Sequence, residues 1–284
     1  MISLLLLACG SQSYEPTRID SLQVVAVRLD RPELRAGEVT AISSHIANPD
    51  ELAVEVLTWT CLQVEVEGEG CVEAQAWSSP SDWISLSTLE GSTAFARREV
   101  PEELDEVFAA VGSSFELPLY VLACETGACP IIEEARAALD QGVVSERLQQ
   151  ALRAPEAWLQ KLDPDRTSLT VRLVRISDSS ESNLNENPTF EARFAEADEP
   201  LIEGRAGSLV DLSFLTSDPN FESVYLYSFT TIGRFAERRV KAESQIVRTW
   251  LELPPNEGEG QVWVVFDDRD GGIAVYSQEV SVTQ

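Results

Sequence analysis

The first half of the chain alternates hydrophobic and polar residues in short runs that turn residues interrupt. A period of two places every second side chain on one face of a β-strand. Such runs cover residues 22–30, 39–48, 54–61, 83–89, 93–100 and 115–124. Short strands at this spacing are typical of an all-β sandwich.

The run at 54–61 carries a candidate core aromatic. Its period puts Leu57, Trp59 and Cys61 on one face. A tryptophan on a central strand that faces the opposite sheet is a core arrangement of immunoglobulin-like (Ig-like) sandwiches. We therefore expect Trp59 to face the second sheet.

A helical block interrupts the β pattern before the last strand of this region. Residues 131–162 carry apolar side chains at helical spacing, and proline or glycine residues separate them into short helices. Alternation then returns, and Leu169, Val171 and Leu173 are predicted to point into the core. The first domain is predicted to span residues 21–178, with the helical block as an insertion.

Residues 177–187 are rich in serine and asparagine and show no hydrophobic period, so the domain boundary is placed there. Strand-like runs follow at intervals that suit a second sandwich. This second domain is predicted to span residues 184–284. The predicted fold class is mainly β: two Ig-like β-sandwich domains, the first with a helical insertion.

The chain begins with an apolar run that ends at a cysteine. Leu6-Leu7-Ala8-Cys9 resembles the lipobox of bacterial lipoprotein precursors, in which the preceding peptide is removed and the cysteine is acylated. This resemblance implies that residues 1–9 are a lipoprotein signal with an acylated Cys9, followed by a flexible tether at 10–20. The alternative is an apolar N-terminus buried in a core, with Cys9 a plain thiol.

The remaining cysteines form an even set: Cys61, Cys71, Cys124 and Cys129. In an exported chain an even set indicates two disulfides, although four cysteines allow three pairings. Proximity in sequence favours Cys61–Cys71 and Cys124–Cys129. A metal site is the less favoured alternative, because the spacings differ from zinc motifs and the sole histidine, His45, is distant in sequence.

The formal net charge of −27 limits the classes of partner. A strongly acidic surface argues against binding nucleic acid and against lying flat on anionic lipid. It suits a solvated protein that a tether holds off a membrane through its N-terminal lipid.

Several segments resemble the Ig-like-domain lipoproteins that some bacteria carry in large sets. They are the N-terminal lipobox, Thr58-Trp59-Thr60-Cys61, Val121-Leu122-Ala123-Cys124, Tyr225-Leu226-Tyr227-Ser228-Phe229 and Trp263-Val264-Val265-Phe266. These motifs are structural and specify no chemistry. The resemblance implies a surface lipoprotein of the cell envelope, anchored in the outer membrane, with tandem Ig-like domains.

No motif in the sequence predicts a catalytic centre. His45 lies in a predicted strand, and neither a Gly-x-Ser-x-Gly elbow nor a phosphate-binding glycine loop accompanies it. Asp267, Asp268 and Asp270 follow a predicted strand and could hold calcium through carboxylate oxygens. The favoured alternative is an ordinary hairpin turn.

Binding is expected in the loops at the ends of the sandwiches, because core packing consumes the strand faces. Trp77 and Trp83 bracket one such loop, where their rings could stack on a ligand or fill the core. The leading hypothesis is a non-catalytic envelope protein without a cofactor, which is structural or binds a protein or glycan. The alternative is an exported enzyme that acts on cell-wall or extracellular polymer through paired carboxylates.

Overall fold

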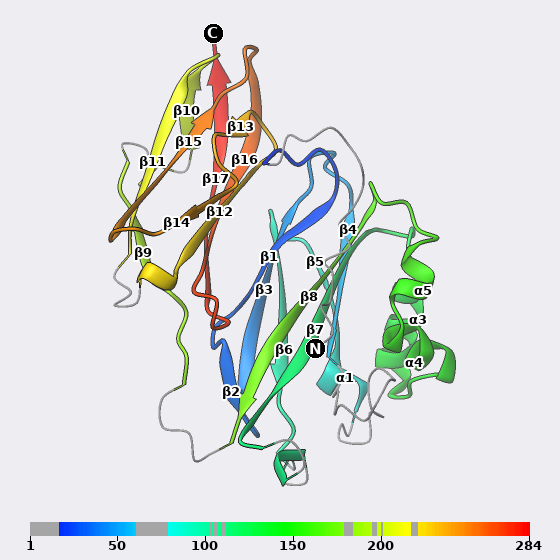
Figure 1. Ribbon diagram of the computed structural model, residues 1–284. Helices are drawn as coiled ribbons and strands as arrows, with labels where there is room; N and C mark the ends of the chain where they lie inside the picture. Colours follow the sequence, from blue (N-terminus) through cyan, green and yellow to red (C-terminus); the bar gives the residue numbers. More distant parts are fainter. Residues whose placement is uncertain are drawn as a thin grey trace.

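The computed structural model describes residues 17–60, 79–102, 104, 107–109, 112–178, 184–194, 198–199, 201–216 and 221–284. Within these ranges the chain forms two β-sandwiches, and short helices flank the first of them (Figure 1). The predicted fold class is therefore confirmed as mainly β, with two Ig-like sandwiches and a helical insertion in the first.

Two sheets form the first domain. One has the strand order β1-β3-β6 and contains β1 (Gln23–Leu29), β3 (Val39–Ala47) and β6 (Thr93–Glu99). The other has the order β2-β8-β7-β4-β5 and contains β2 (Glu33–Arg35), β8 (Thr167–Ser177), β7 (Ser114–Glu125), β4 (Val54–Thr60) and β5 (Ile84–Thr88). Neighbouring strands are antiparallel except β2 and β8, which are parallel. Apart from β2, which none of the alternating runs covers, these strands lie where the runs predict them.

Alternate residues of each strand form the core between the two sheets. On β7 the inward side chains are buried: Leu117, Leu119, Val121 and Ala123. They belong to the same cluster as Ile42 of β3 in the opposite sheet. Removing this apolar surface from water is the main favourable term in folding, at about 25 cal/mol per Å2.

The inward phase of β8 is opposite to the predicted one. Val171 and Leu173 are 49% and 52% exposed, whereas Arg172 and Val174 are buried. Leu169 is partly buried on the outer face, against the helical insertion. The prediction was wrong because it assigned the inward face by hydrophobicity, and on this strand an arginine with hydrogen-bond partners occupies that face.

Trp59 is fully buried, but it faces away from the second sheet. Its ring stacks on Tyr120 of the same sheet at a centroid distance of 4.9 Å, and its Nε1–H donates to the Leu152 oxygen at 3.2 Å. Leu152 belongs to the helical insertion. The predicted orientation is wrong because this sheet has cores on both faces, and Trp59 belongs to the outer one.

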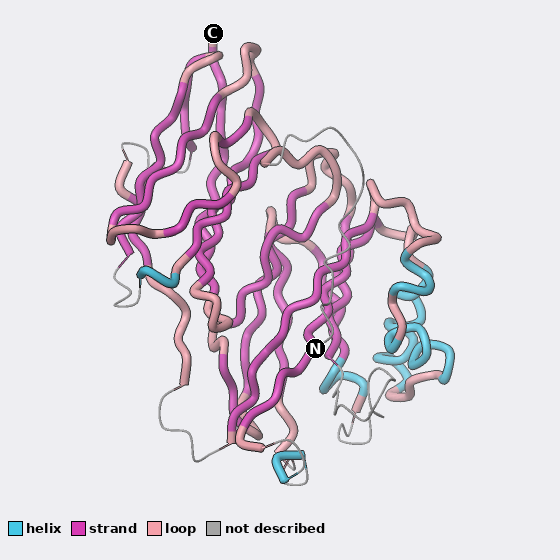
Figure 2. Tube along the Cα trace, viewed as in Figure 1, coloured by secondary structure: helices cyan, strands magenta, loops and turns pink. Residues whose placement is uncertain are grey.

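The helical insertion lies between β7 and β8 and packs on the outer face of their sheet (Figures 1 and 2). Its helices are α3 (Pro130–Gln141), α4 (Glu146–Arg153) and α5 (Glu156–Leu159). Gly142 ends α3 at φ +69, and the Ser145 hydroxyl caps α4 by accepting the Leu148 N–H. Trp83, at the end of α1 (Pro80–Trp83), is buried in the same cluster and therefore fills a core instead of offering a face to a ligand.

Over its described residues, the second domain repeats this architecture without a helical insertion. One sheet has the order β10-β17-β16-β12-β14 and contains β10 (Leu201–Arg205), β17 (Ile273–Thr283), β16 (Gly258–Asp267), β12 (Tyr225–Thr230) and β14 (Arg239–Lys241). The other has the order β13-β15-β11-β9 and contains β13 (Arg234–Phe235), β15 (Ile246–Glu252), β11 (Leu209–Thr216) and β9 (Phe190–Ala192). A short 3-10 helix, η2 (Phe221–Ser223), precedes β12. As in the first domain, a short early strand runs parallel to the last one, here β10 beside β17.

Several predictions fall outside the described residues. They concern the lipidated Cys9 with residues 1–9, the tether up to residue 16, the Cys61–Cys71 pair and Trp77. Among the helices that the structure describes, none is long and apolar enough to cross a membrane.

Candidate functional site

The two sandwiches contact each other through one sheet face of each. Trp263 of β16 is buried against Ala47 of β3 and Ile19. Partly buried apolar residues surround this contact: Val25, Phe229 and Val275. The junction therefore covers Trp263 on the outer face of β16 and Ala47 at the end of β3, and β1 and β17 also contact each other across it.

Residues 17–20 belong to the segment assigned from sequence to the tether, and here they form part of the junction. The Ile19 N–H donates to the Thr230 oxygen at 2.7 Å, and the Thr230 N–H donates to the Thr17 oxygen at 2.9 Å. The Thr17 hydroxyl also accepts the Phe235 N–H at 2.9 Å. The segment that enters the first domain is thus bonded to β12 of the second.

Two asparagines that precede β9 close the junction at its other end. The Asn187 side chain donates to the Leu29 oxygen at 2.7 Å and accepts the Ile273 N–H at 2.9 Å. The Asn185 side chain donates to the Asp268 carboxylate at 3.2 Å. The stretch that lacks a hydrophobic period therefore contains specific bridges between the domains.

Arg172 and Asp268 are the buried charges of this junction. The Arg172 guanidinium donates to the main-chain oxygens of Val27 and Gly271, so it spans both domains. Burial lowers its pKa to about 10, and the nearby Asp267 and Asp268 oppose that change. Burial raises the pKa of Asp268, against the effect of hydrogen bonds from Asp270 N, Gly272 N and Asn185.

The loop that was the calcium candidate is part of this junction. Asp268 Oδ1 accepts the N–H groups of Asp270 and Gly272, each at 2.8 Å, and Asp267 Oδ1 accepts the Arg269 N–H at 2.7 Å. The carboxylates of Asp267 and Asp268 thus bind the loop's own amides. The described residues contain no group of three or more His, Cys, Asp or Glu side chains that could hold a metal ion.

A groove of about 460 Å3 opens where loops of the first domain meet β16 of the second. Its walls are the β3–β4 loop, the β5–β6 turn and Thr126 after β7, and Gln261 of β16 completes it. The described lining residues are Ile46, Asn48, Glu51, Leu52, Ala53, Val54, Thr88, Leu89, Gly91, Ser92, Thr126 and Gln261. Its volume lies in the range of ligand pockets in proteins.

One wall of the groove is a tightly tied loop. The Asn48 side chain donates to the Leu52 oxygen at 2.8 Å and accepts the Leu52 N–H at 3.0 Å. Within this loop Glu51 has φ +51, a left-handed conformation that is uncommon for residues other than glycine. Such conformations cost free energy and persist only where the surroundings fix them. The two hydrogen bonds between Asn48 and Leu52 and the left-handed backbone of Glu51 therefore fix the conformation of this loop.

The opposite wall is bonded to the second domain. Gln261 Nε2 donates to the Ser92 hydroxyl at 2.8 Å, across the two domains. Ser92 follows Gly91, which has φ +62 in the β5–β6 turn, and its main-chain oxygen accepts the Ile46 N–H at 2.8 Å. The first domain therefore supplies most of the described lining, and Gln261 of the second domain completes the groove where the two domains meet.

The groove offers hydrogen bonds and apolar contacts more than acid–base chemistry. Glu51 is the one ionisable side chain among its described lining residues. Leu52 and Leu89 add apolar surface, and Asn48 and Thr126 add polar groups. General acid–base hydrolysis of a glycan needs two opposed carboxyl groups. The described lining therefore suits binding of a partner better than cleavage of one.

His45 lies on β3, outside this groove. Its Nδ1 is 3.5 Å from the Thr93 hydroxyl of the neighbouring strand. Burial, together with the positive charge of Arg28, lowers the pKa of His45 to about 4. The imidazole is therefore neutral at pH 7 and packs as a structural residue.

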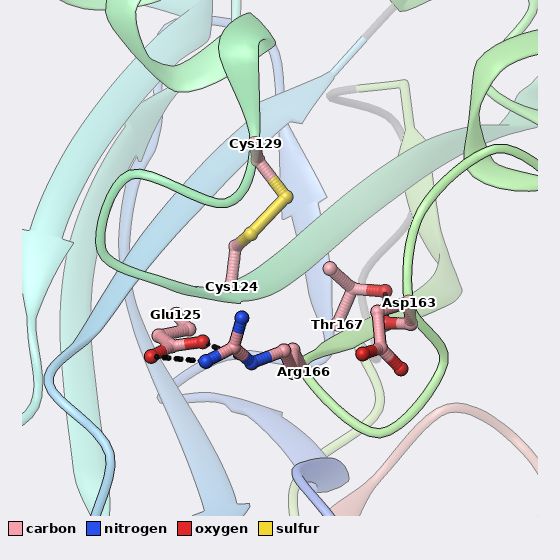
Figure 3. Close-up of a disulfide and its surroundings, with 6 residues drawn as sticks. All are labelled: Cys124, Glu125, Cys129, Asp163, Arg166 and Thr167. Atoms are coloured by element: carbon pink, nitrogen blue, oxygen red, sulfur yellow. Dashed lines mark hydrogen bonds and ion pairs between the residues drawn. A yellow bond between two sulfur atoms is a disulfide. The ribbon is translucent and has the colours of Figure 1, made fainter.

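Cys124 and Cys129 form a disulfide where β7 leads into α3 (Figure 3). Beside it, Glu125 and Arg166 form an ion pair at 2.5 Å, and the Glu125 N–H donates to the Arg166 oxygen. Arg166 immediately precedes β8, so these contacts join the two ends of the helical insertion. The ion pair and hydrogen bond between Glu125 and Arg166 thus close the insertion at its base, and the disulfide fixes the start of α3 to the end of β7.

No protein-family model matches this chain, and neither does any curated protein. Among solved structures the chain is similar to the D0–D1 domain of intimin, with 10% identity and a TM-score of 0.24 over 90% of this chain and 98% of that one. It is also similar to the N-terminal Ig1–2 module of the Drosophila receptor protein tyrosine phosphatase DLAR, with 9% identity and a TM-score of 0.28 over 93% of this chain and 100% of that one. A third similar structure is that of the Yersinia pseudotuberculosis adhesin InvE, with 8% identity and a TM-score of 0.24 over 91% of this chain and 58% of that one.

Likenesses at these identities and TM-scores carry no argument about function. The class of the protein follows from its own strand pairing, in which each domain has two packed sheets and a parallel pair between an early strand and the last one. The chain is a tandem Ig-like β-sandwich protein.

Proposed function

We propose that this chain is a non-catalytic, lipid-anchored protein of the cell envelope that binds a protein or glycan partner in the groove at its domain junction. The observation that carries the proposal is the groove itself. It is rigid, it has the volume of a ligand pocket, and it is lined by both domains.

The lipid anchor rests on Leu6-Leu7-Ala8-Cys9, which resembles a lipobox. The same resemblance implies that the protein is anchored in the outer membrane. Acyl chains supply about 0.8 kcal/mol per buried CH₂, so two or three of them hold a protein firmly. Mass spectrometry of the membrane fraction should find a diacylated or triacylated Cys9, and Cys9→Ser should release the protein. A soluble mature chain that keeps Met1 would contradict the anchor.

The groove is tested by filling it. Ala53 is exposed in the groove wall, so Ala53→Trp should occupy the space without disturbing either core. Ala137 is exposed on α3, and Ala137→Trp adds the same indole to a different surface. The chain without residues 1–9, immobilised and exposed to native envelope extract, should retain a partner with wild-type and Ala137→Trp chains but not with Ala53→Trp.

Equal retention by all three chains would move the binding site away from the groove. The alternative, that the protein is an exported enzyme, requires a different observation. A saturable hydrolytic activity on an envelope polymer, lost when one carboxylate is substituted, would replace the binding proposal.

A further inference from the structure

An arginine–tyrosine cluster lies on the outer face of the second domain, away from the groove. Tyr225 and Tyr227 are two residues apart on β12, so their rings share one face. The Arg239 guanidinium lies 3.9 Å from the Tyr225 ring centroid and 5.6 Å from that of Tyr227, and the Arg269 guanidinium lies 5.1 Å from Tyr225. These distances are typical of cation–π contacts, which hold the two guanidinium groups against the sheet.

Lys241 adds a third positive charge to this cluster. It lies opposite Tyr225 in the β12–β14 register, just as Arg239 lies opposite Tyr227. In the part of the chain that the structure describes, neither Arg239, Lys241 nor Arg269 forms an ion pair with a carboxylate. The acidic residue in register with Tyr225 is Asp267, whose Oδ1 accepts the Arg269 N–H. The three positive charges thus lie close together, without an ion-pair partner among the described residues, on a chain of net charge −27.

The cluster lies at a sheet edge. β14 is the last strand in the order β10-β17-β16-β12-β14. The Ser228 N–H donates to the Arg238 oxygen and the Ala242 N–H donates to the Val224 oxygen, each at 3.0 Å. Since hydrogen-bonding direction alternates along an antiparallel strand, the main-chain groups of Arg239 and Lys241 point to the free edge.

We propose that β14 is a docking edge for an extended acidic segment of a partner protein, which adds a strand to this sheet. Main-chain hydrogen bonds to Arg239 and Lys241 would supply affinity, and alternate carboxylates of the segment would face the two cationic side chains. The stacked Arg239 guanidinium is already ordered, so it presents its donors to a carboxylate with less loss of entropy.

An acidic polypeptide fits this site better than a glycan does. A sugar ring stacks on a bare aromatic face. Here Arg239 lies over Tyr225 at 3.9 Å, so that ring face is already occupied. The available chemistry is a pair of cations beside free main-chain donors and acceptors, which matches an extended acidic strand.

The test uses a blocked synthetic peptide of alternating Glu and Val, a Gln-for-Glu version of it, and polygalacturonate. The full chain should bind the Glu peptide, with an affinity that falls as salt rises, and should not bind the Gln peptide. The double variant Arg239→Gln/Lys241→Gln should weaken binding by about tenfold or more. Arg248→Gln, an exposed arginine on the other sheet of this domain, should leave binding unchanged.

Hydrogen exchange distinguishes strand addition from simple attraction. The bound Glu peptide should slow exchange of the Arg239 and Lys241 amides, because each would donate a hydrogen bond to the added strand and lose contact with water. Binding without this protection, equal binding of both peptides, or protection by polygalacturonate alone would overturn the proposal. So would the absence of binding, which would leave the cations as a guard against unwanted edge pairing.

Discussion

The guanidinium of Arg172, inside the first domain, donates a hydrogen bond to the main-chain oxygen of Gly271, in the second. It also donates to Val27 of its own domain, so one side chain satisfies oxygens on both sides of the junction. A buried carbonyl without a partner is costly, and here one arginine removes that cost for two of them. The relative position of the domains is therefore linked to the interior of the first sandwich.

Substituting Arg172 should loosen the two domains. Arg172→Met keeps much of the apolar stem but leaves the Val27 and Gly271 oxygens unpaired, at about 1–3 kcal/mol each when they stay buried. Calorimetry should resolve separate transitions for the two domains where the wild-type chain shows one. Arg97→Met, on an exposed position of β6, is the control and should melt like wild type. Identical melting of both variants would contradict a bridging role for Arg172.

Asp268 should make stability fall as the pH rises. Its folded pKa is raised by burial from 3.8, so the folded state holds a proton that the unfolded state releases. Its contribution is therefore most favourable below pH 3.8 and declines as the pH rises through the folded pKa. Asp268→Asn lacks this titration, so denaturant unfolding across that range should show the variant gaining stability relative to wild type.

Two companion variants sharpen the Asp268 measurement. Asp268→Ala also removes the acceptor for the Asp270 and Gly272 amides, and it should cost about 1–3 kcal/mol at all pH values. Asp211→Asn removes an exposed carboxylate on β11 that is not among the groups acting on Asp268, and it should leave the pH dependence of wild type intact. A pH profile for Asp268→Asn that coincides with wild type would refute the assignment.

His45 should act in the opposite direction. Its folded pKa of about 4 lies below the usual 6.5, so the unfolded state binds a proton that the folded state does not. Stability is then lost as the pH falls from 6.5 to 4, by roughly 3 kcal/mol in total at 1.36 kcal/mol per pKa unit. Relative to wild type, His45→Gln should lose stability less steeply over this range in urea unfolding. An NMR titration of His45 with a midpoint near 6.5 would show that the imidazole is not buried as described.

Trp59 should hold the helical insertion to its sheet. Trp59→Phe removes the Nε1–H bond to the Leu152 oxygen and leaves a cavity, so it should destabilise by about 2–4 kcal/mol. The α4–α5 region should then become the first site of limited proteolysis. Trp250→Phe is the matched control, because Trp250 is 41% exposed and should change stability by less than about 0.5 kcal/mol. Equal losses in the two variants would argue against a second core around Trp59.

The positions of the longer strands could be predicted from the sequence, because a period of two is a local property of the chain, but the short strands β2, β10, β13 and β14 were missed. The face that each strand presents could not be predicted, as Trp59 and β8 show. Trp59 shares a face with Leu57 as predicted, yet the partner of that face is the helical insertion, about 90 residues further along. On β8, hydrophobicity points to Val171 and Leu173, while the buried Arg172 sets the actual phase.

The groove and the role of Asp268 were also beyond prediction, for a related reason. Gln261 and Ser92 are 169 residues apart and meet only because the domains dock. Asp268 was grouped with its sequence neighbours as a calcium candidate, but its partners include Asn185, from the segment before the second sandwich. Local patterns report local structure, and both features depend on packing between domains.

The hydrogen bond between Thr17 and Thr230 determines where a mechanical force on the N-terminus would act on the fold. A force applied at the N-terminus would act first on the domain junction and would be shared by the two sandwiches. The hydrogen bonds that Thr17 and Ile19 make with the second domain would carry this force before the strands of either core do. Because this attachment lies at the junction between the domains, both sandwiches would extend away from the point where the protein is held.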